Sequence, residues 1–167
     1  MDLAVVPFDD PDAVRLISEV QQEYVERYGA PDITRVDPAQ FAPPRGVFVV
    51  GYADGEPVAC GGWRCRGGDA EIKRMYVVSS ARGKGFARSV LTELERSAAA
   101  AGRDRVVLET GTKQPEAIGL YRSSGYHEIP AFGIYQDEPD CLCFAKELRT
   151  QRGPGEPAPT GSVSCGR

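Results

Sequence analysis

The feature that most constrains the fold is a glycine-rich basic turn that joins a strand pattern to a helix pattern. The β-rich run Glu71–Val78 passes through small and polar residues into Arg82-Gly83-Lys84-Gly85, and an apolar stripe at helical spacing covers Gly83–Ala101. Gly102 then ends the helix pattern, and a second strand is expected over Arg105–Thr110. A strand, a helix and a strand in this order form a right-handed crossover between parallel strands. The turn is therefore expected where a helix begins, at the end of a strand.

The first half of the chain has the pattern of an antiparallel meander with one helix. A helix is expected over Pro11–Tyr28, with capping residues before it and Gly29 to end it. One more helical turn is expected over Pro38–Phe41, and Asp54-Gly55 marks a hairpin turn. Strands rich in β-branched and aromatic residues are expected over Leu3–Val6, Val47–Tyr52 and Pro57–Arg66.

The second half continues with a helix and two late strands. The helix is expected over Pro115–Ser123, and the strands over Tyr126–Ile129 and Cys141–Leu148 are expected to close the sheet in antiparallel fashion. The predicted fold class is α/β (α+β), with a mixed central sheet and flanking helices. Residues 1–150 are expected to form one domain. Residues 151–167 are rich in Gly, Pro and Ser and are expected to form a disordered tail.

The composition narrows the range of partners. A chain of 167 residues is the size of one ordinary domain, and its net charge of -4 argues against a nucleic-acid ligand. It lacks the uninterrupted run of about eighteen or more apolar residues that a membrane helix needs. The start Met1-Asp2-Leu3 has neither the basic nor the apolar region of a signal peptide. A cytoplasmic protein is therefore expected.

The five cysteines bear on redox and metal chemistry. Their odd number, without a secretory signal, predicts reduced thiols rather than a disulfide framework. Cys141 and Cys143 are spaced so that both side chains lie on one face of a strand. A zinc site would need two more ligands, and the only histidine is His127. No metal is therefore expected, and the pair is interpreted as small buried apolar residues.

The turn at residues 82–85 has the physical properties of a phosphate-binding site. The start of a helix carries unpaired backbone N–H groups and a partial positive charge. Gly83 and Gly85 have no side chain to hold an anion at a distance, and Arg82 and Lys84 add formal positive charge. The turn is therefore predicted to bind a phosphate group.

Two familiar nucleotide-binding loops do not fit this turn. A P-loop has Gly-Lys followed by Ser or Thr, whereas the order here is Lys84-Gly85-Phe86, and Arg88 stands where the dinucleotide fingerprint needs Gly or Ala. The pattern that matches is R-x-x-G-x-A, at Arg82, Gly85 and Ala87. It resembles the pyrophosphate motif of the GCN5-related N-acetyltransferase (GNAT) family.

Two further stretches carry the same resemblance. The run Glu71–Val77 is similar to the central strand of the family, and Ala117–Tyr121 followed by Gly125-Tyr126 is similar to its late helix and closing turn. Order and spacing agree over residues 46–148. The resemblance implies a GNAT-like mixed central sheet, in which an antiparallel N-terminal meander precedes a βαβ half that binds acetyl-CoA.

The resemblance also implies which residues bind acetyl-CoA as a co-substrate. The basic turn would bind the pyrophosphate, and the end of the preceding strand would pair with the pantetheine arm as an added strand would. Gln114 lies where many relatives carry an asparagine, so the amide is kept on a longer side chain. The implied cofactor-binding residues are Met75, Tyr76, Val77, Arg82, Gly83, Lys84, Gly85, Phe86, Ala87 and Gln114.

Acetyl transfer to an amine requires that the amine lose a proton and that the departing thiolate gain one. The resemblance implies Tyr121 as the general acid, because a phenol pKa of about 10 lies only about 1.5 units above that of a thiol. The alternative role of Tyr121 is aromatic packing of the last helix. Glu71 is the implied general base, acting through a water; the alternative is a carboxylate paired with Lys73 or Arg74. Glu109, on the next strand, is a substitute for Glu71.

The predicted function is N-acetylation of a primary amine on a small molecule or an amino-acid-like acceptor, by direct transfer in a ternary complex. A non-catalytic acyl-CoA-binding regulatory module and a protein or peptide N-acetyltransferase remain open, as does a homodimer. A covalent route through Cys141 or Cys143 with His127 has no specific support. The acceptor site is expected near Tyr24, Arg27, Tyr28, Phe41, the glycines beside Trp63, and Phe132–Tyr135.

Overall fold

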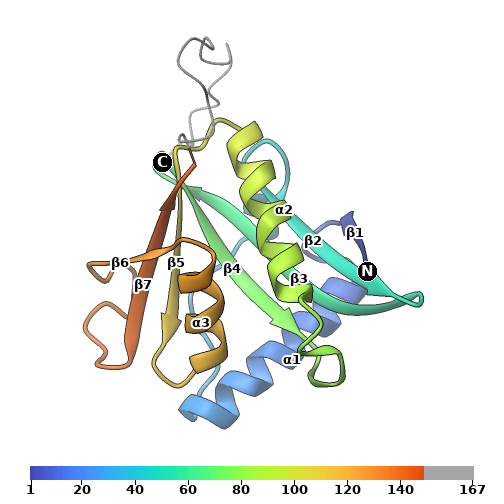
Figure 1. Ribbon diagram of the computed structural model, residues 1–167, viewed down its shortest axis with the longest axis horizontal. Helices are drawn as coiled ribbons and strands as arrows, with labels where there is room; N and C mark the ends of the chain where they lie inside the picture. Colours follow the sequence, from blue (N-terminus) through green and yellow to red (C-terminus); the bar gives the residue numbers. More distant parts are fainter. Residues whose placement is uncertain (149–167) are drawn as a thin grey trace.

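One mixed sheet of seven strands lies at the centre of the structure (Figure 1). The computed structural model describes residues 1–148, and the strands lie in the order β1-β2-β3-β4-β5-β7-β6. Neighbouring strands are antiparallel except for β4 and β5, which are parallel. This arrangement confirms the predicted antiparallel meander followed by a parallel strand–helix–strand unit. The strands are β1 (Asp2–Val5), β2 (Gly46–Ala53), β3 (Glu56–Arg66), β4 (Asp69–Val77), β5 (Arg105–Gly111), β6 (His127–Ile129) and β7 (Cys141–Glu147).

Helices cover both faces of the sheet. In Figure 1, α2 and α3 lie in front of the strands and α1 lies behind them. None of the helices within residues 1–148 is long and apolar enough to cross a membrane. The α-helices are α1 (Pro11–Tyr28), α2 (Phe86–Ala100) and α3 (Pro115–Ser123), and two short 3₁₀ helices are η1 (Pro38–Phe41) and η2 (Ser79–Ala81).

The alternation of side chains along β2 divides the core into two layers. Val47 and Val49 pack with residues of α2 and α3, whereas Phe48 and Val50 pack with residues of α1 and η1. Successive strand residues point to opposite faces, so an apolar run without alternation is expected for a strand covered on both sides. The burial of both faces of β2 under helices therefore follows from this short sequence.

The boundaries of α1 agree with the capping pattern of the sequence. The Asp10 carboxylate accepts a hydrogen bond from the backbone N–H of Asp12 at 2.9 Å, and Pro11 occupies the first turn. Gly29 ends the helix with a left-handed φ of 80°, and its N–H donates to the carbonyl of Val25. Both ends of α1 are thus set by local chemistry, which explains why the sequence predicted them.

Other predictions need correction. Strand β6 begins at His127 rather than Tyr126, because Tyr126 is buried against α2 and α3 instead. Cys60, Cys141 and Cys143 are free thiols, as predicted, and Cys165 lies outside the described residues. The predicted disordered tail, residues 151–167, lies outside the described residues.

We expect Gly46→Ala to destabilise the fold strongly, because a Cβ at this position would meet backbone on two sides. It would lie 2.1 Å from the carbonyl oxygen of Gln40 and 2.5 Å from that of Trp63. Overpacking of this kind lowers the free energy of unfolding by roughly 1–3 kcal/mol. The matched control is Gly119→Ala in α3, where a Cβ would meet nothing within 4 Å. That change should raise the free energy of unfolding by roughly 0.5–1 kcal/mol. Urea unfolding of both variants measures the difference, and equal stability would contradict the packing described for β2.

Candidate active site

The parallel strands β4 and β5 pair briefly and then diverge. Their register runs from Ala70↔Val106 to Ile72↔Leu108 and does not continue beyond that pair. Figure 1 shows the two strands separating toward their carboxyl ends. A cavity of about 660 Å³ opens there, lined by residues of α1, α3 and the turn before α2. Ligands of open α/β sheets bind at the carboxyl ends of strands, so this cavity is the candidate active site.

A β-bulge lies in β4 where the two strands part. The register between β3 and β4 shifts from Gly62↔Lys73 to Cys60↔Tyr76. Arg74, inside the bulge, has a φ of 60°, which is uncommon for a residue with a side chain. A bulge bends its own strand, so the residues after it turn away from β5. Met75, Tyr76 and Val77 line the cavity, as expected, and lack a strand partner on that side.

The turn before α2 presents main-chain amides to the cavity. Helix α2 begins at Phe86 and not at the expected Gly83, because Gly83 and Gly85 have φ values of 77° and 79°, outside the helical region. The backbone N–H groups of residues 83–88 donate to no acceptor among the described residues. Gly83, Gly85, Phe86 and Ala87 line the cavity. Amides without acceptors at the start of a helix are suited to bind an anion.

The two expected cations of this turn are placed differently. The Arg82 guanidinium lines the cavity, donates through Nε to the carbonyl of Val77 at 3.0 Å, and lies 2.6 Å from a carboxylate oxygen of Glu23. Lys84 is exposed and does not line the cavity. Arg82 can therefore contact a bound anion directly, whereas Lys84 contributes charge from a distance.

Tyr121 of α3 brings a buried phenol to the cavity. Its ring lies 5.6 Å from that of Tyr126 and 6.2 Å from that of Phe144, centroid to centroid. Its hydroxyl makes no hydrogen bond to any residue in the described part of the chain. Burial raises the pKa of Tyr121 well above its ordinary value, so the phenol stays protonated at neutral pH. Tyr121 thus combines the packing role with a hydroxyl that is available to a ligand.

Of the two candidate bases, only Glu109 lines the cavity. Glu71 is buried, and its two oxygens lie 3.2 Å from Arg64 Nε and 3.5 Å from Lys73 Nζ. This is the ion-paired arrangement that was the alternative for Glu71. The Oε1 atom of Glu109 lies 3.4 Å from Lys73 Nζ, while its buried Oε2 atom has no hydrogen-bond partner among residues 1–148. Burial raises the pKa of Glu109, and Lys73 opposes that rise.

A model of the "Acetyltransferase (GNAT) family" matches residues 14–126, more than half of the chain. The chain belongs to this family. It is 36% identical over 137 residues to the IAA acetyltransferase of Azospirillum brasilense, covering 81% of this chain and 90% of that one. The GNAT assignment makes the protein an acyltransferase, in agreement with the prediction from the sequence.

Solved structures place the GNAT fold on almost the whole chain. A Klebsiella pneumoniae protein described as an acyl-CoA N-acyltransferase superposes with a TM-score of 0.75 at 27% identity, over 88% of this chain and 97% of that one. An aminoglycoside 6'-N-acetyltransferase in complex with coenzyme A superposes with a TM-score of 0.68 at 16% identity, over 89% of this chain and 97% of that one. At that identity the second likeness concerns the fold alone.

One wall of this GNAT cavity is built by residues that sequence reasoning missed. Asp32 follows α1, accepts hydrogen bonds from Arg74 at 2.5 Å and from the Tyr135 hydroxyl at 3.1 Å, and lies on the cavity surface. Burial alone would raise the pKa of Asp32, but Lys73, Thr34 and Arg74 outweigh it and lower the pKa to about 2. The loop that holds Asp32 has no periodicity, so nothing in the local sequence indicated this role.

Arg88 was also missed as a cavity residue. The Arg88 side chain is exposed, and it lines the cavity beside the turn. Its guanidinium donates to the hydroxyls of Ser123 and Ser124 at 2.7 Å and 2.9 Å. Its place one residue after the R-x-x-G-x-A motif, in the first turn of α2, is the signal that could have identified it.

The residues expected around the acceptor lie on the cavity only in part. Tyr24, Tyr28 and Tyr135 line the cavity, whereas Phe41 and Trp63 are buried in the core and do not. Gln114 lines the cavity and donates from Nε2 to the Tyr28 hydroxyl at 3.4 Å. The amide of Gln114 is therefore partly engaged by α1.

Proposed function

We propose that the protein transfers the acetyl group of acetyl-CoA directly to a primary amine of a small molecule, in a ternary complex. One observation carries the proposal: the acceptor-free amides of Gly83 and of residues 85–88, together with Tyr121 and Glu109, belong to residues that line one cavity. These are the three kinds of group that pyrophosphate binding, protonation of a thiolate and deprotonation of an amine require. Under this proposal the two ends of the cavity receive the two substrates.

The cofactor would lie along the gap between β4 and β5. Its pyrophosphate would accept hydrogen bonds from the amides of residues 83–88, with Arg82 and Arg88 nearby to balance its charge. Its pantetheine arm would pair with the main chain of Met75–Val77, which has no partner on the β5 side. This placement would direct the thioester along β4 into the cavity that Tyr121 lines.

Glu109 is better suited than Glu71 to accept the proton of the amine. An alkylammonium of pKa about 10.4 is neutral in only roughly one molecule in 2,500 at pH 7, so a proton acceptor in the cavity speeds the reaction. The Oε2 atom of Glu109 has no partner among the described residues and lies on the cavity wall, whereas both oxygens of Glu71 are engaged by cations. The proton would pass from the amine to Glu109, directly or through a water.

Tyr121 would hydrogen-bond and protonate the departing thiolate. A buried phenol is a weaker acid than one in water, and the same burial raises the pKa of the thiol that leaves beside it. The two groups therefore remain close in acidity inside the cavity. The hydroxyl of Tyr121 needs to break no other hydrogen bond within residues 1–148 to do this.

The proposal is tested by incubating the purified protein with acetyl-CoA and a panel of amines and measuring release of free thiol. The panel holds amino acids, polyamines and peptides, and IAA is tested beside it as a separate acceptor, because the relative from Azospirillum brasilense carries that name. Thiol release with small amines supports the proposal. Release only with peptides would favour protein acetylation, and tight acetyl-CoA binding without release would favour a regulatory acyl-CoA-binding module.

Comparison of two amide variants assigns the base. We expect Glu109→Gln to lower kcat/KM about 100-fold without changing the Kd of coenzyme A, because general base catalysis contributes at least that factor. Glu71→Gln removes a paired carboxylate outside the cavity, so it should lower the melting temperature more than kcat/KM. The opposite result would contradict this assignment. If Glu71→Gln folds but no longer transfers the acetyl group, while Glu109→Gln stays active, Glu71 is the general base.

A further inference from the structure

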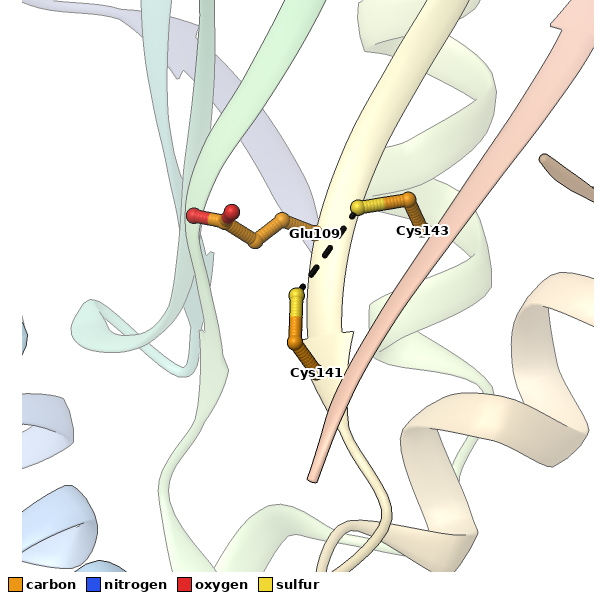
Figure 2. A group of neighbouring side chains, drawn as sticks. All are labelled: Glu109, Cys141 and Cys143. Atoms are coloured by element: carbon orange, nitrogen blue, oxygen red, sulfur yellow. Dashed lines mark hydrogen bonds between the residues drawn. The ribbon is translucent and has the colours of Figure 1, made fainter. Parts of the chain in front are cut away.

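A cluster of three metal-ligating side chains lies at the junction of β5 and β7. Glu109 pairs directly with Cys143 across the two antiparallel strands, and Cys141 lies two residues before Cys143 on the same face of β7. Figure 2 shows the two sulfur atoms facing each other, on the side of the strands to which Glu109 also projects. Cys141 and Glu109 also line the cavity, so the cluster is open to ligands that enter it.

The geometry of the cluster fits a tetrahedral ion. The two sulfur atoms are 4.0 Å apart, close to the roughly 3.8 Å that a tetrahedral ion with metal–sulfur bonds of about 2.3 Å imposes. The two sulfurs and a carboxylate oxygen of Glu109 all lie within 4.8 Å of one another. Small rotations of three side chains would bring all three atoms into bonding distance of one ion.

A carboxylate oxygen of Glu109 that lacks a hydrogen-bond partner indicates that this cluster binds a cation. The Glu109 side chain is only 11% exposed, and its buried Oε2 atom accepts no hydrogen bond from the described residues. Lys73 lies 3.4 Å from the other oxygen and leaves Oε2 without a partner. Buried carboxylate oxygens are normally paired, so an oxygen of this kind calls for a ligand that supplies positive charge or a proton.

We propose that Glu109, Cys141 and Cys143 form a binding site for a thiophilic divalent cation such as Zn²⁺. The two thiols release their protons to solvent and bind as thiolates, the carboxylate is the third ligand, and a water completes the tetrahedron. Two thiolates and one carboxylate carry three negative charges, which the cation and the neighbouring Lys73 ammonium neutralise. Cysteine ligands select zinc-like ions over Mg²⁺ or Ca²⁺, which take oxygen ligands.

Occupation of this site would inhibit acetyl transfer. The ion would engage the carboxylate that accepts the proton of the amine and would occupy the part of the cavity beside Cys141. This consequence rests on the proposed function, whereas binding of the ion does not. The two are therefore measured separately.

Binding is tested with Co²⁺, which reports its ligands by absorption. Added to the reduced full-length protein, Co²⁺ should produce a sulfur-to-cobalt band in the near ultraviolet that saturates at one equivalent, and Zn²⁺ should bleach it because it binds more tightly. We expect Co²⁺ binding to weaken at least roughly tenfold in each of three variants, Cys141→Ser, Cys143→Ser and Glu109→Gln. Loss of a residue that only hydrogen-bonds to a metal ligand already costs that much affinity, and these variants remove a ligand itself. The control is Cys60→Ser, which keeps a donor to the Arg74 carbonyl and should leave the band unchanged.

Three results would overturn the site: no thiolate band with the wild-type protein, a band that persists when both Cys141 and Cys143 are serine, or an affinity that Glu109→Gln does not alter.

Inhibition is measured as the ratio of acetyl-transfer rates with and without one equivalent of Zn²⁺. That ratio should fall at least tenfold in the wild-type protein and stay near one in Cys143→Ser. The thiol-release assay contains no added metal, so its result does not depend on whether the protein binds Co²⁺. Failure of the metal site and failure of the proposed function are therefore distinguishable.

Discussion

Gly85→Asp is expected to weaken coenzyme A binding about 100-fold more than Gly85→Asn. Both side chains tolerate the left-handed φ of 79° found at this position, and a Cβ there meets nothing within 4 Å. The two variants therefore differ chiefly in one negative charge at the turn. A unit charge about 4 Å from a phosphate costs roughly 4 kcal/mol at an effective dielectric constant of 20, and partial exposure of the turn reduces this toward the 2.7 kcal/mol that corresponds to 100-fold.

Isothermal titration of each variant with coenzyme A measures the difference. It should shrink as the salt concentration rises, because salt screens exposed charges. Thermal unfolding is expected to be alike for the two variants, which excludes misfolding as the cause. Equal affinities of Gly85→Asp and Gly85→Asn at low salt would show that the pyrophosphate does not bind at this turn.

Tyr121→Phe is expected to lower kcat about 100-fold while leaving the Kd of coenzyme A nearly unchanged. The phenol would act only when the thiolate departs, so its loss affects the transition state rather than binding, and acid catalysis contributes roughly 100-fold or more. The hydroxyl has no hydrogen-bond partner among the described residues, so its removal should not lower the melting temperature. The rate should thus fall while the stability stays unchanged, which a purely structural role for the ring would not produce.

The matched control is Tyr126→Phe. Tyr126 is equally buried, its ring lies 5.6 Å from that of Tyr121, and its hydroxyl donates to Glu95 at 3.0 Å without lining the cavity. Its loss should cost roughly 1 kcal/mol of stability and leave kcat within about twofold. An unaffected kcat in Tyr121→Phe would remove the phenol from the mechanism and return Tyr121 to packing.

How much the sequence could predict depended on whether a feature is local. The basic turn, the ends of α1 and the pairing of the N-terminal meander were predictable because capping, glycine conformation and strand alternation act between neighbouring residues. The start of α2 was misplaced by three residues, from Gly83 to Phe86, since both turn glycines adopt φ values that no helix uses. Glycines can extend a turn or open a helix, and composition alone does not distinguish the two.

The candidate site shows the same division. Tyr121 and the residues of R-x-x-G-x-A were predicted from two continuous stretches of sequence, and they line the same cavity. Asp32 and Tyr135 come from two irregular loops that meet through a hydrogen bond, and no pattern joins them along the chain. Glu71 and Glu109 were not separable from the sequence, because the register of β4 and the cations around each carboxylate decide which one reaches the cavity.

The sequence by itself therefore determined the fold class and the likeness to GNAT acetyltransferases, because a strand, a turn rich in unpaired amides and a helix are adjacent along the chain. The tertiary structure alone decided which carboxylate lines the cavity and that Glu109 lies beside Cys141 and Cys143. Those contacts join residues that are more than thirty positions apart, and strand register and the bulge at Arg74 control them. A one-residue change in register would turn these side chains to the opposite face of the sheet, and no local preference specifies that choice.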